Sequence, residues 1–102
     1  MELGKLKKLQ VLHINGNMLS GNIPASLRNC KSLESLDLSR NGLSGKVPEW
    51  ILDLSKLRIL VLRSNNLEGE IPIRIRYLQK LQILDLPMNR LSGLIPPHNS
   101  NI

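Results

Sequence analysis

The stretch NMLSGNIPASL at residues 17–27 decides the fold of this chain. A proline between apolar residues ordinarily ends a helix and interrupts a central strand. Nearly the same phrase returns as NGLSGKVPEWI at residues 41–51 and as NNLEGEIPIRI at residues 65–75. The proline therefore recurs at a fixed spacing. Self-similarity at a period of roughly 20–50 residues indicates a stacked repeat architecture.

The frame of the repeat keeps its register at a step of 24 residues without an insertion. Its columns are Asn17, Asn41, Asn65 and Asn89; Gly21, Gly45, Gly69 and Gly93; and Pro24, Pro48, Pro72 and Pro96, with leucine columns that begin at Leu9, Leu12 and Leu19. We predict one domain over residues 1–98, with a partial unit at 1–8, full units at 9–32, 33–56 and 57–80, and an incomplete unit at 81–98. Residues 99–102 form a polar tail.

Each unit contains one predicted strand and one predicted turn of helix. The segments LQVLHIN, LESLDLS, LRILVLR and LQILDLP alternate with a period of two, which indicates a short strand with one buried face. Stacked units place these strands in parallel, about 4.8 Å apart. The framework Asn is expected to turn the chain inward and to bind leftover backbone groups, so that Asn17, Asn41, Asn65 and Asn89 form a ladder. After Gly and Ile-Pro, the segment xxLxxL returns as a short 3₁₀ or α-helical turn.

The combined string LxxLxxLxLxxNxLxGxIPxxLxxL is similar to the plant-specific type of leucine-rich repeat over almost the whole chain. SLRNCKSLESLDLS and LRSNNLEGEIP resemble phrases from ectodomains of plant receptor-like proteins and receptor kinases. The resemblance implies an α/β fold, namely a right-handed solenoid with a concave parallel sheet, a further sheet at L-x-G-x-I-P and short returning helices. It also implies binding of peptides, small ligands or protein partners, in plant signalling or defence.

Those ectodomains usually carry more repeats, a signal peptide and cysteine-paired caps. None of these is present in the sequence, and it contains no N-glycosylation sequon. The resemblance points to the cell surface or the extracellular space, but the residues themselves assign no compartment. Solenoid ends without caps expose apolar rungs and unpaired backbone groups, so we expect weak self-association through them.

The composition of the chain excludes some classes of binding partner and favours others. Fourteen Lys and Arg against eight Asp and Glu give a net charge of +6, which favours acidic partners. Aromatic residues make up only 2% of the chain, so the stacking platforms of a nucleic-acid binder are missing and we do not expect nucleic acid. The single cysteine, Cys30, occupies a leucine column and is expected to be a buried structural thiol. No apolar run reaches the roughly 20 residues that a membrane span requires.

Catalysis is the weaker interpretation of the polar strand residues. His13 and Asp37 would share a column on adjacent strands, with Ser35 and Ser39 nearby, and these residue types occur together in hydrolases. A flat parallel sheet offers no pocket and no evident oxyanion hole. Asp37 and Asp85 would stand about 10 Å apart, beyond the usual separation of a carboxylate pair. We therefore predict a non-enzymatic protein without a metal or cofactor.

Two surfaces are candidate binding sites. The first is the concave face, predicted to bind a protein or peptide through Val11, His13, Asn15, Ser35, Asp37, Ser39, Arg40, Ile59, Val61, Arg63, Ile83, Asp85 and Met88. The second is the convex side, where an anionic surface would meet Lys8, Lys56, Lys80, Arg74 and Arg76. On that side Trp50 is the most plausible single anchor.

Three functions follow from these surfaces. The favoured one is a non-enzymatic protein-interaction module that uses the concave or lateral face. The second is binding of an anionic or repetitive non-protein surface, such as pectin, ice or membrane headgroups, by the convex side; the threonine-poor strands count against ice. The third is a truncated piece of a repeat protein without an activity of its own.

Overall fold

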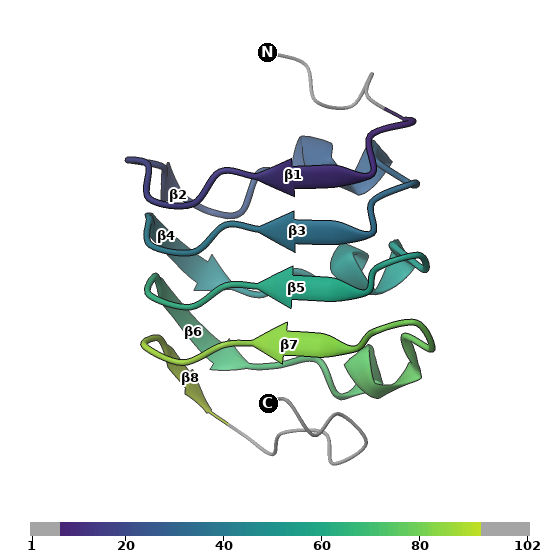
Figure 1. Ribbon diagram of the computed structural model, residues 1–102. Coiled ribbons are helices and arrows are strands. Elements are labelled where there is room, and N and C mark those ends of the chain that lie inside the picture. The colour runs from purple at the N-terminus through teal and green to yellow at the C-terminus, as the bar shows by residue number, and fades with distance from the viewer. Residues whose placement is uncertain (1–6, 93–102) are drawn as a thin grey trace.

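The computed structural model describes residues 7–92. Most of the predicted partial unit 1–8 lies outside this range, as do the end of the predicted unit 81–98, the tail 99–102 and the frame residues Gly93 and Pro96. The described chain is a stack of similar coils, each of which adds one strand to each of two sheets (Figure 1). The strands at the front of Figure 1 run to the left, the helices return behind them, and each coil lies below the last, so the solenoid is right-handed.

The first sheet, called sheet A here, is parallel and has the strand order β1-β3-β5-β7. Its strands are β1 (Val11–His13), β3 (Ser35–Asp37), β5 (Ile59–Val61) and β7 (Ile83–Asp85). Leu12 pairs with Leu36, and Leu36 with Leu60, so neighbours in the sheet are one sequence period apart. The period-two pattern therefore predicted both the strands and their register correctly.

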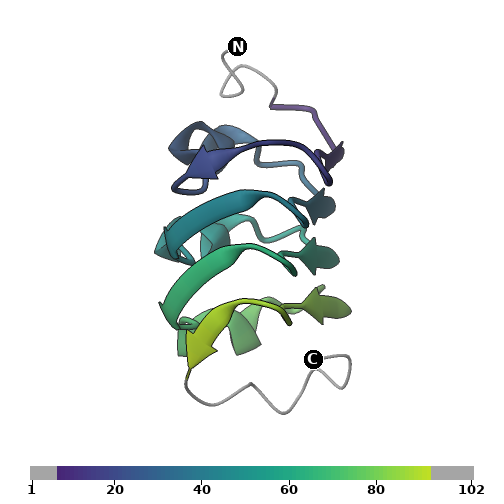
Figure 2. The same cartoon turned by 90° about the vertical axis from the view of Figure 1, so that its left-hand side faces the viewer.

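The second sheet, called sheet B here, is formed by the segments that contain the framework glycine. Its strands are β2 (Ser20–Gly21), β4 (Gly42–Lys46), β6 (Asn66–Glu70) and β8 (Arg90–Ser92), in the order β2-β4-β6-β8. Figure 2 shows these strands on one side of the stack. Ser44 pairs with Asn66, a step two residues shorter than in sheet A, because these strands cross the stack at a slant (Figure 1).

Within residues 7–92, three coils return through a five-residue 3₁₀ helix that begins after the framework proline. The helices are η2 (Ala25–Asn29), η3 (Glu49–Asp53) and η4 (Ile73–Tyr77). The proline carbonyl accepts the first helical hydrogen bond: Leu27 N donates to Pro24 O at 3.1 Å, and Ile75 N to Pro72 O at 3.0 Å. Proline suits this place because its fixed φ fits the entry to a helix and its missing N–H would have had no partner there.

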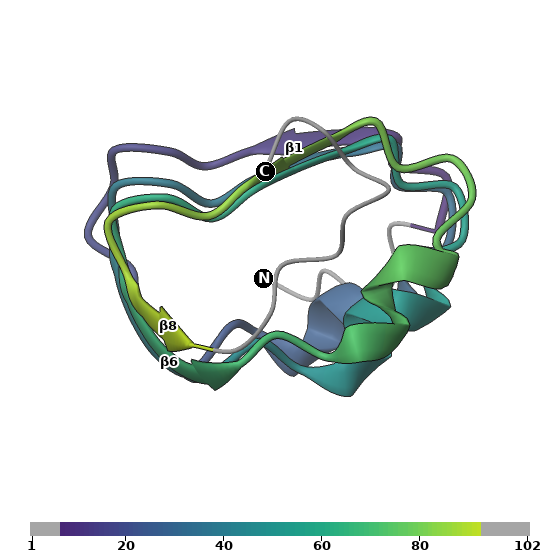
Figure 3. The same cartoon turned by 90° about the horizontal axis from the view of Figure 1, so that it is seen from below.

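Leucine and isoleucine fill the space between the two sheets and the helices. Figure 3, a view along the stack, shows sheet A along one edge, with sheet B and the helices closing the other side. Leu36, Leu60 and Leu84 point inward from sheet A and are fully buried. Cys30 is also buried, as its place in a leucine column predicted, and burial raises the pKa of its thiol.

The asparagine ladder is present at three of its four predicted positions. Asn65 Oδ1 accepts from Leu43 N at 3.1 Å, and its Nδ2 lies 3.0 Å from Leu38 O, so the side chain joins its own coil to the preceding one. Nδ2 also reaches two carbonyls of its own turn, those of Leu62 and Arg63. Asn41 and Asn89 make the equivalent set of contacts.

The ladder prediction for Asn17 is not tested by the described part of the chain. Its side chain is exposed, and its one contact with residues 7–92 is a 3.2 Å hydrogen bond from Nδ2 to Asn15 O. A ladder asparagine takes two of its four partners from the coil before it, as Asn41 does from Leu19 N and Ile14 O. Among the described residues no coil precedes the one that contains Asn17.

Candidate functional site

The outward face of sheet A holds most of the residues predicted to contact a partner. The parallel register aligns them in two columns, Val11, Ser35, Ile59 and Ile83, and then His13, Asp37, Val61 and Asp85. Val11 is 54% exposed and Ile83 is 39% exposed, while Ile59 and Val61 are half-buried. Ile59 lies directly beside Ile83, so the face carries a small apolar surface between its charged residues.

Two serines on this face offer little to a partner. Ser35 and Ser39 were expected to be exposed, but their exposed fractions are only 9% and 5%. His13 Nε2 lies 2.8 Å from Ser35 Oγ, and the imidazole therefore covers the serine. Strand alternation gives the direction of a side chain correctly, but it says nothing about a longer neighbour that folds over it.

The charged residues of the face are largely satisfied by one another. Arg63 forms a hydrogen-bonded ion pair with Asp85 on the next coil. Arg58 lies 4.0 Å from the Glu34 carboxylate and donates to Gln82 Oε1 at 3.3 Å, so it links three coils. These cross-strand contacts fix the arginine side chains alongside the apolar residues.

Arg40 and Met88 lie on the turns that follow the strands and not on the strand face itself. Their φ angles are 57° and 63°, in the left-handed region, and both side chains are exposed. Ser64 and Gly16 take the same conformation at the equivalent positions, with φ of 60° and 70°. Glycine favours a positive φ, so Gly16 was the one residue of this column that could have predicted the turn. The other three units carry Arg, Ser and Met there, which hid the pattern. Asn15, like them, is exposed beyond the end of a strand.

The serine, histidine and aspartate that invited a hydrolase interpretation do not form a relay. His13 contacts Ser35, but the Asp37 carboxylate accepts a hydrogen bond from the backbone N–H of Ser39 at 3.0 Å. The nucleophile candidate is buried under the imidazole that would have to activate it. This arrangement supports the non-catalytic interpretation of the face.

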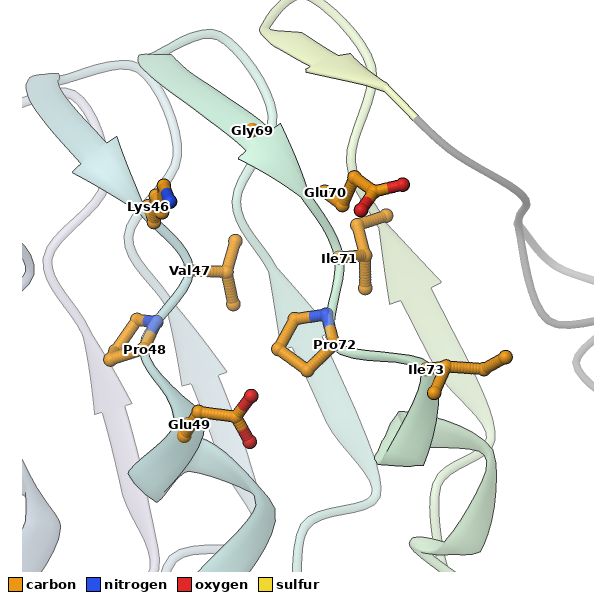
Figure 4. Close-up of a pocket in the computed structure, with 9 residues that line it drawn as sticks. All are labelled: Lys46, Val47, Pro48, Glu49, Gly69, Glu70, Ile71, Pro72 and Ile73. Carbon is orange, nitrogen blue, oxygen red and sulfur yellow. The ribbon is translucent and has the colours of Figure 1, made fainter.

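An open groove, which the sequence analysis did not predict, lies between the proline segments of neighbouring coils. Figure 4 shows it: residues 46–49 form one wall, residues 69–73 form the other, and its volume is about 910 Å³. Val47 and Ile71 form a buried apolar floor, and Lys46, Glu49 and Glu70 stand at the rim. Arg74 lies 3.7 Å from Glu49, so one rim carboxylate already has a partner. A smaller groove with Trp50 in its wall lies one coil earlier.

The side of the molecule that carries the 3₁₀ helices is the convex side of the sequence prediction. We call it the helical side; it comprises residues 7–9, 23–33, 47–57 and 71–81. Lys8, Lys56, Lys80, Arg74 and Arg76 are all exposed there, as predicted. Trp50 is half-buried and packs against the core, whereas Tyr77 is 72% exposed, so tyrosine is the more accessible aromatic residue.

Residues 7–92 contain no group of three or more His, Cys, Asp or Glu side chains that could hold a metal ion. Among the same residues, no helix has the length and apolar character needed to cross a bilayer.

Comparison with protein families gives leucine-rich repeats along nearly the whole chain. A model described as Leucine Rich repeats (2 copies) matches residues 7–52, and one described as Leucine Rich Repeat matches residues 56–78 and 80–102. Comparison with curated proteins returned no match. The resemblance inferred from L-x-G-x-I-P is thereby confirmed at the level of the repeat.

Solved structures of plant proteins match the described coils closely. A chain of the BIR3–SERK2 complex from Arabidopsis thaliana is 41% identical with a TM-score of 0.87, and the match covers 93% of this chain and 51% of that one. A plant ice-binding protein is 41% identical with a TM-score of 0.87, over 92% of this chain and 31% of that one. The Arabidopsis receptor kinase HAESA, solved with the peptide hormone IDA and the co-receptor SERK1, is 36% identical with a TM-score of 0.85, over 91% of this chain and 16% of that one. This chain therefore spans about half or less of each of these structures.

Proposed function

Because this chain belongs to the leucine-rich repeat family and is similar to ectodomains of plant receptor kinases, we propose that it is a protein-interaction module that binds a peptide or protein on the outward face of sheet A. The proposal includes a role in plant ligand recognition, in signalling or defence. It includes no catalytic step, because the polar residues of the face bind one another and the backbone.

The observation that carries the proposal is the apolar surface on the outward face of sheet A. Ile59 and Ile83 pair across the sheet, Val61 lies on the same face, and the arginines beside them are held in place by ion pairs. Exposed apolar area bordered by fixed polar groups is typical of protein contact sites. Preordered arginines also lower the entropy that binding would otherwise cost.

The shape of the ligand follows from the geometry of the sheet. Equivalent residues recur at each strand, about 4.8 Å apart. An extended peptide laid across the strands would therefore meet a new apolar or charged residue at each coil. The receptor HAESA, solved with a peptide hormone, is the similar structure that motivates a peptide as the first class to test.

The test compares two matched substitutions, Ile83→Glu on sheet A and Ile73→Glu on the helical side. Both side chains are exposed, Ile73 at 65% and Ile83 at 39%, so both variants should fold. The immobilised chain is incubated with extracellular plant extract and with a library of extended peptides. We expect the ligands retained by the unmodified chain to be lost with Ile83→Glu at low and high salt, and kept with Ile73→Glu. Loss with Ile73→Glu alone, or no retained ligand at all, would contradict the proposal.

A further inference from the structure

The net charge of the molecule lies entirely on one side. The helical side carries eight basic residues against two acidic ones, Glu49 and Asp53, which gives +6. Sheet A and its turns carry three of each sign, and sheet B with its ends carries two of each. The remaining charges, Glu2 and Lys5, cancel, so the +6 of the whole sequence equals that of the helical side.

The basic residues form rows along the stack. Lys8, Lys56 and Lys80 occupy one position of the repeat, Arg28 and Arg76 a second, and Lys7 and Lys31 a third. All of these side chains are exposed. Among residues 7–92, the ion pairs on this side are limited to Arg74 with Glu49. The rows are thus available to an external anion, unlike Arg58 and Arg63 of sheet A.

A groove on the helical side contains two successive members of the first row together with an aromatic ring. It has a volume of about 340 Å³ and is lined by Lys56 and Lys80 from successive coils, with Leu52 and the exposed Tyr77 beside them. A groove of this kind holds a chain better than it holds a flat surface. An exposed ring in the same groove as two lysines suits a ligand that alternates anionic groups with rigid, partly apolar rings.

We propose that the helical side binds a linear polymer of uronic acid through this groove. Tyr77 stacks on one sugar ring, and Lys56 and Lys80 pair with carboxylates of successive sugars. The excess of positive charge on this side favours a polyanion, and attraction between the two weakens with salt. A nucleic acid would need a series of stacking aromatics, and the groove has one. The inference is independent of the function proposed for sheet A.

The experiment measures binding of the 102-residue chain to polygalacturonate at low and at moderate salt. Dextran serves as the neutral polymer, polyglutamate as the acidic polypeptide, and vesicles that contain phosphatidylserine as the anionic membrane. We expect polygalacturonate to bind more tightly than the other three, and to weaken as salt increases. Equal or tighter binding of the vesicles or of polyglutamate would overturn the proposal, as would equal binding of dextran.

Matched variants locate the contact. Lys80→Glu and Arg90→Glu change the net charge equally, but Arg90 is exposed on sheet B. We expect Lys56→Glu/Lys80→Glu to weaken polygalacturonate binding by about tenfold or more, and Arg90→Glu to change it by about twofold or less. Tyr77→Ala, which leaves the charge unchanged, should weaken it by about fivefold, as loss of a stacking contact does. Equal effects of Lys80→Glu and Arg90→Glu, or no effect of Tyr77→Ala, would overturn the assignment to this groove.

Discussion

The first and third coils, residues 9–32 and 57–80, share the same frame residues but differ in how these residues are bonded and buried. Asn65 makes four hydrogen bonds and stitches two coils together, whereas Asn17 makes one exposed contact among the described residues. Leu60 is fully buried, but its counterpart Leu12 is only partly buried. Met18 stands 97% exposed on the first coil. The contribution of a frame residue to stability therefore depends on the contacts that neighbouring coils offer it.

This difference is typical of solenoids, whose stability is approximately a sum of repeat terms and nearest-neighbour terms. The third coil has a described neighbour on each side, so its strand β5 pairs with both β3 and β7. Strand β1 pairs only with β3 within residues 7–92. Substitution of equivalent residues in the two coils separates the repeat term from the neighbour term.

The largest contrast is expected for leucine in the strand centre. Leu60→Ala leaves a cavity in a closed core and should lower the free energy of unfolding by about 4 kcal/mol. Leu12→Ala removes a partly exposed side chain and should cost about 1–2 kcal/mol. Urea unfolding followed by circular dichroism measures both. Equal losses would mean that the first coil is packed as tightly as the third, contrary to the exposure of Leu12.

The next contrast is between the two asparagines. Asn65→Ala leaves Leu43 N and Leu38 O buried without their partner and should destabilise the chain by about 3 kcal/mol. Asn17→Ala loses one exposed hydrogen bond and should cost less than about 0.5 kcal/mol. Asn65→Asp has the same shape as asparagine but lacks the N–H donors, so it should be as damaging as alanine. A mild Asn65→Asp would show that volume, and not hydrogen bonding, holds the coils together.

The smallest contrast concerns the framework glycines. Gly21 and Gly45 have φ of 76° and 81°, so alanine is strained at either place by about 1 kcal/mol. A Cβ at Gly45 would also meet Asn22 Oδ1 of the preceding coil, whereas Gly21 has open space around it. We expect Gly45→Ala to cost about 1 kcal/mol more than Gly21→Ala. The double variant Asn22→Ala/Gly45→Ala should remove that excess, and persistence of the excess would show that the contact is not its cause.

Much of the fold was predictable because the leucines and prolines of the frame act through local backbone and side-chain preferences. Alternating leucines define a strand, and proline fixes the start of η2, η3 and η4 through its own φ angle. A period without insertions favours a register of one full period, and sheet A adopts it. The ladder role of Asn17 stays a prediction: the sequence repeats the residue, but the coil that would supply its inter-coil partners is not among those described.

The candidate site was predictable only in part. The columns of the sheet A face followed from strand alternation, but the burial of Ser35 under His13 depends on a side chain from another coil. The groove of Figure 4 likewise needs two proline segments side by side, which no single repeat contains. The partner-binding role of these surfaces stays a prediction until the matched variants are measured.

The sequence by itself determined the repeat, the parallel strands, the turns of helix after each proline and the excess of positive charge. These follow from local backbone preferences and from composition, which need no knowledge of the neighbours. Only the tertiary structure decided that the whole +6 falls on the helical side, that Arg58 and Arg63 pair with carboxylates of other coils, and that Lys56, Lys80 and Tyr77 share a groove. Stacking brings residues 24 positions apart within reach of one another, and charge balance and groove shape exist only after that contact is made.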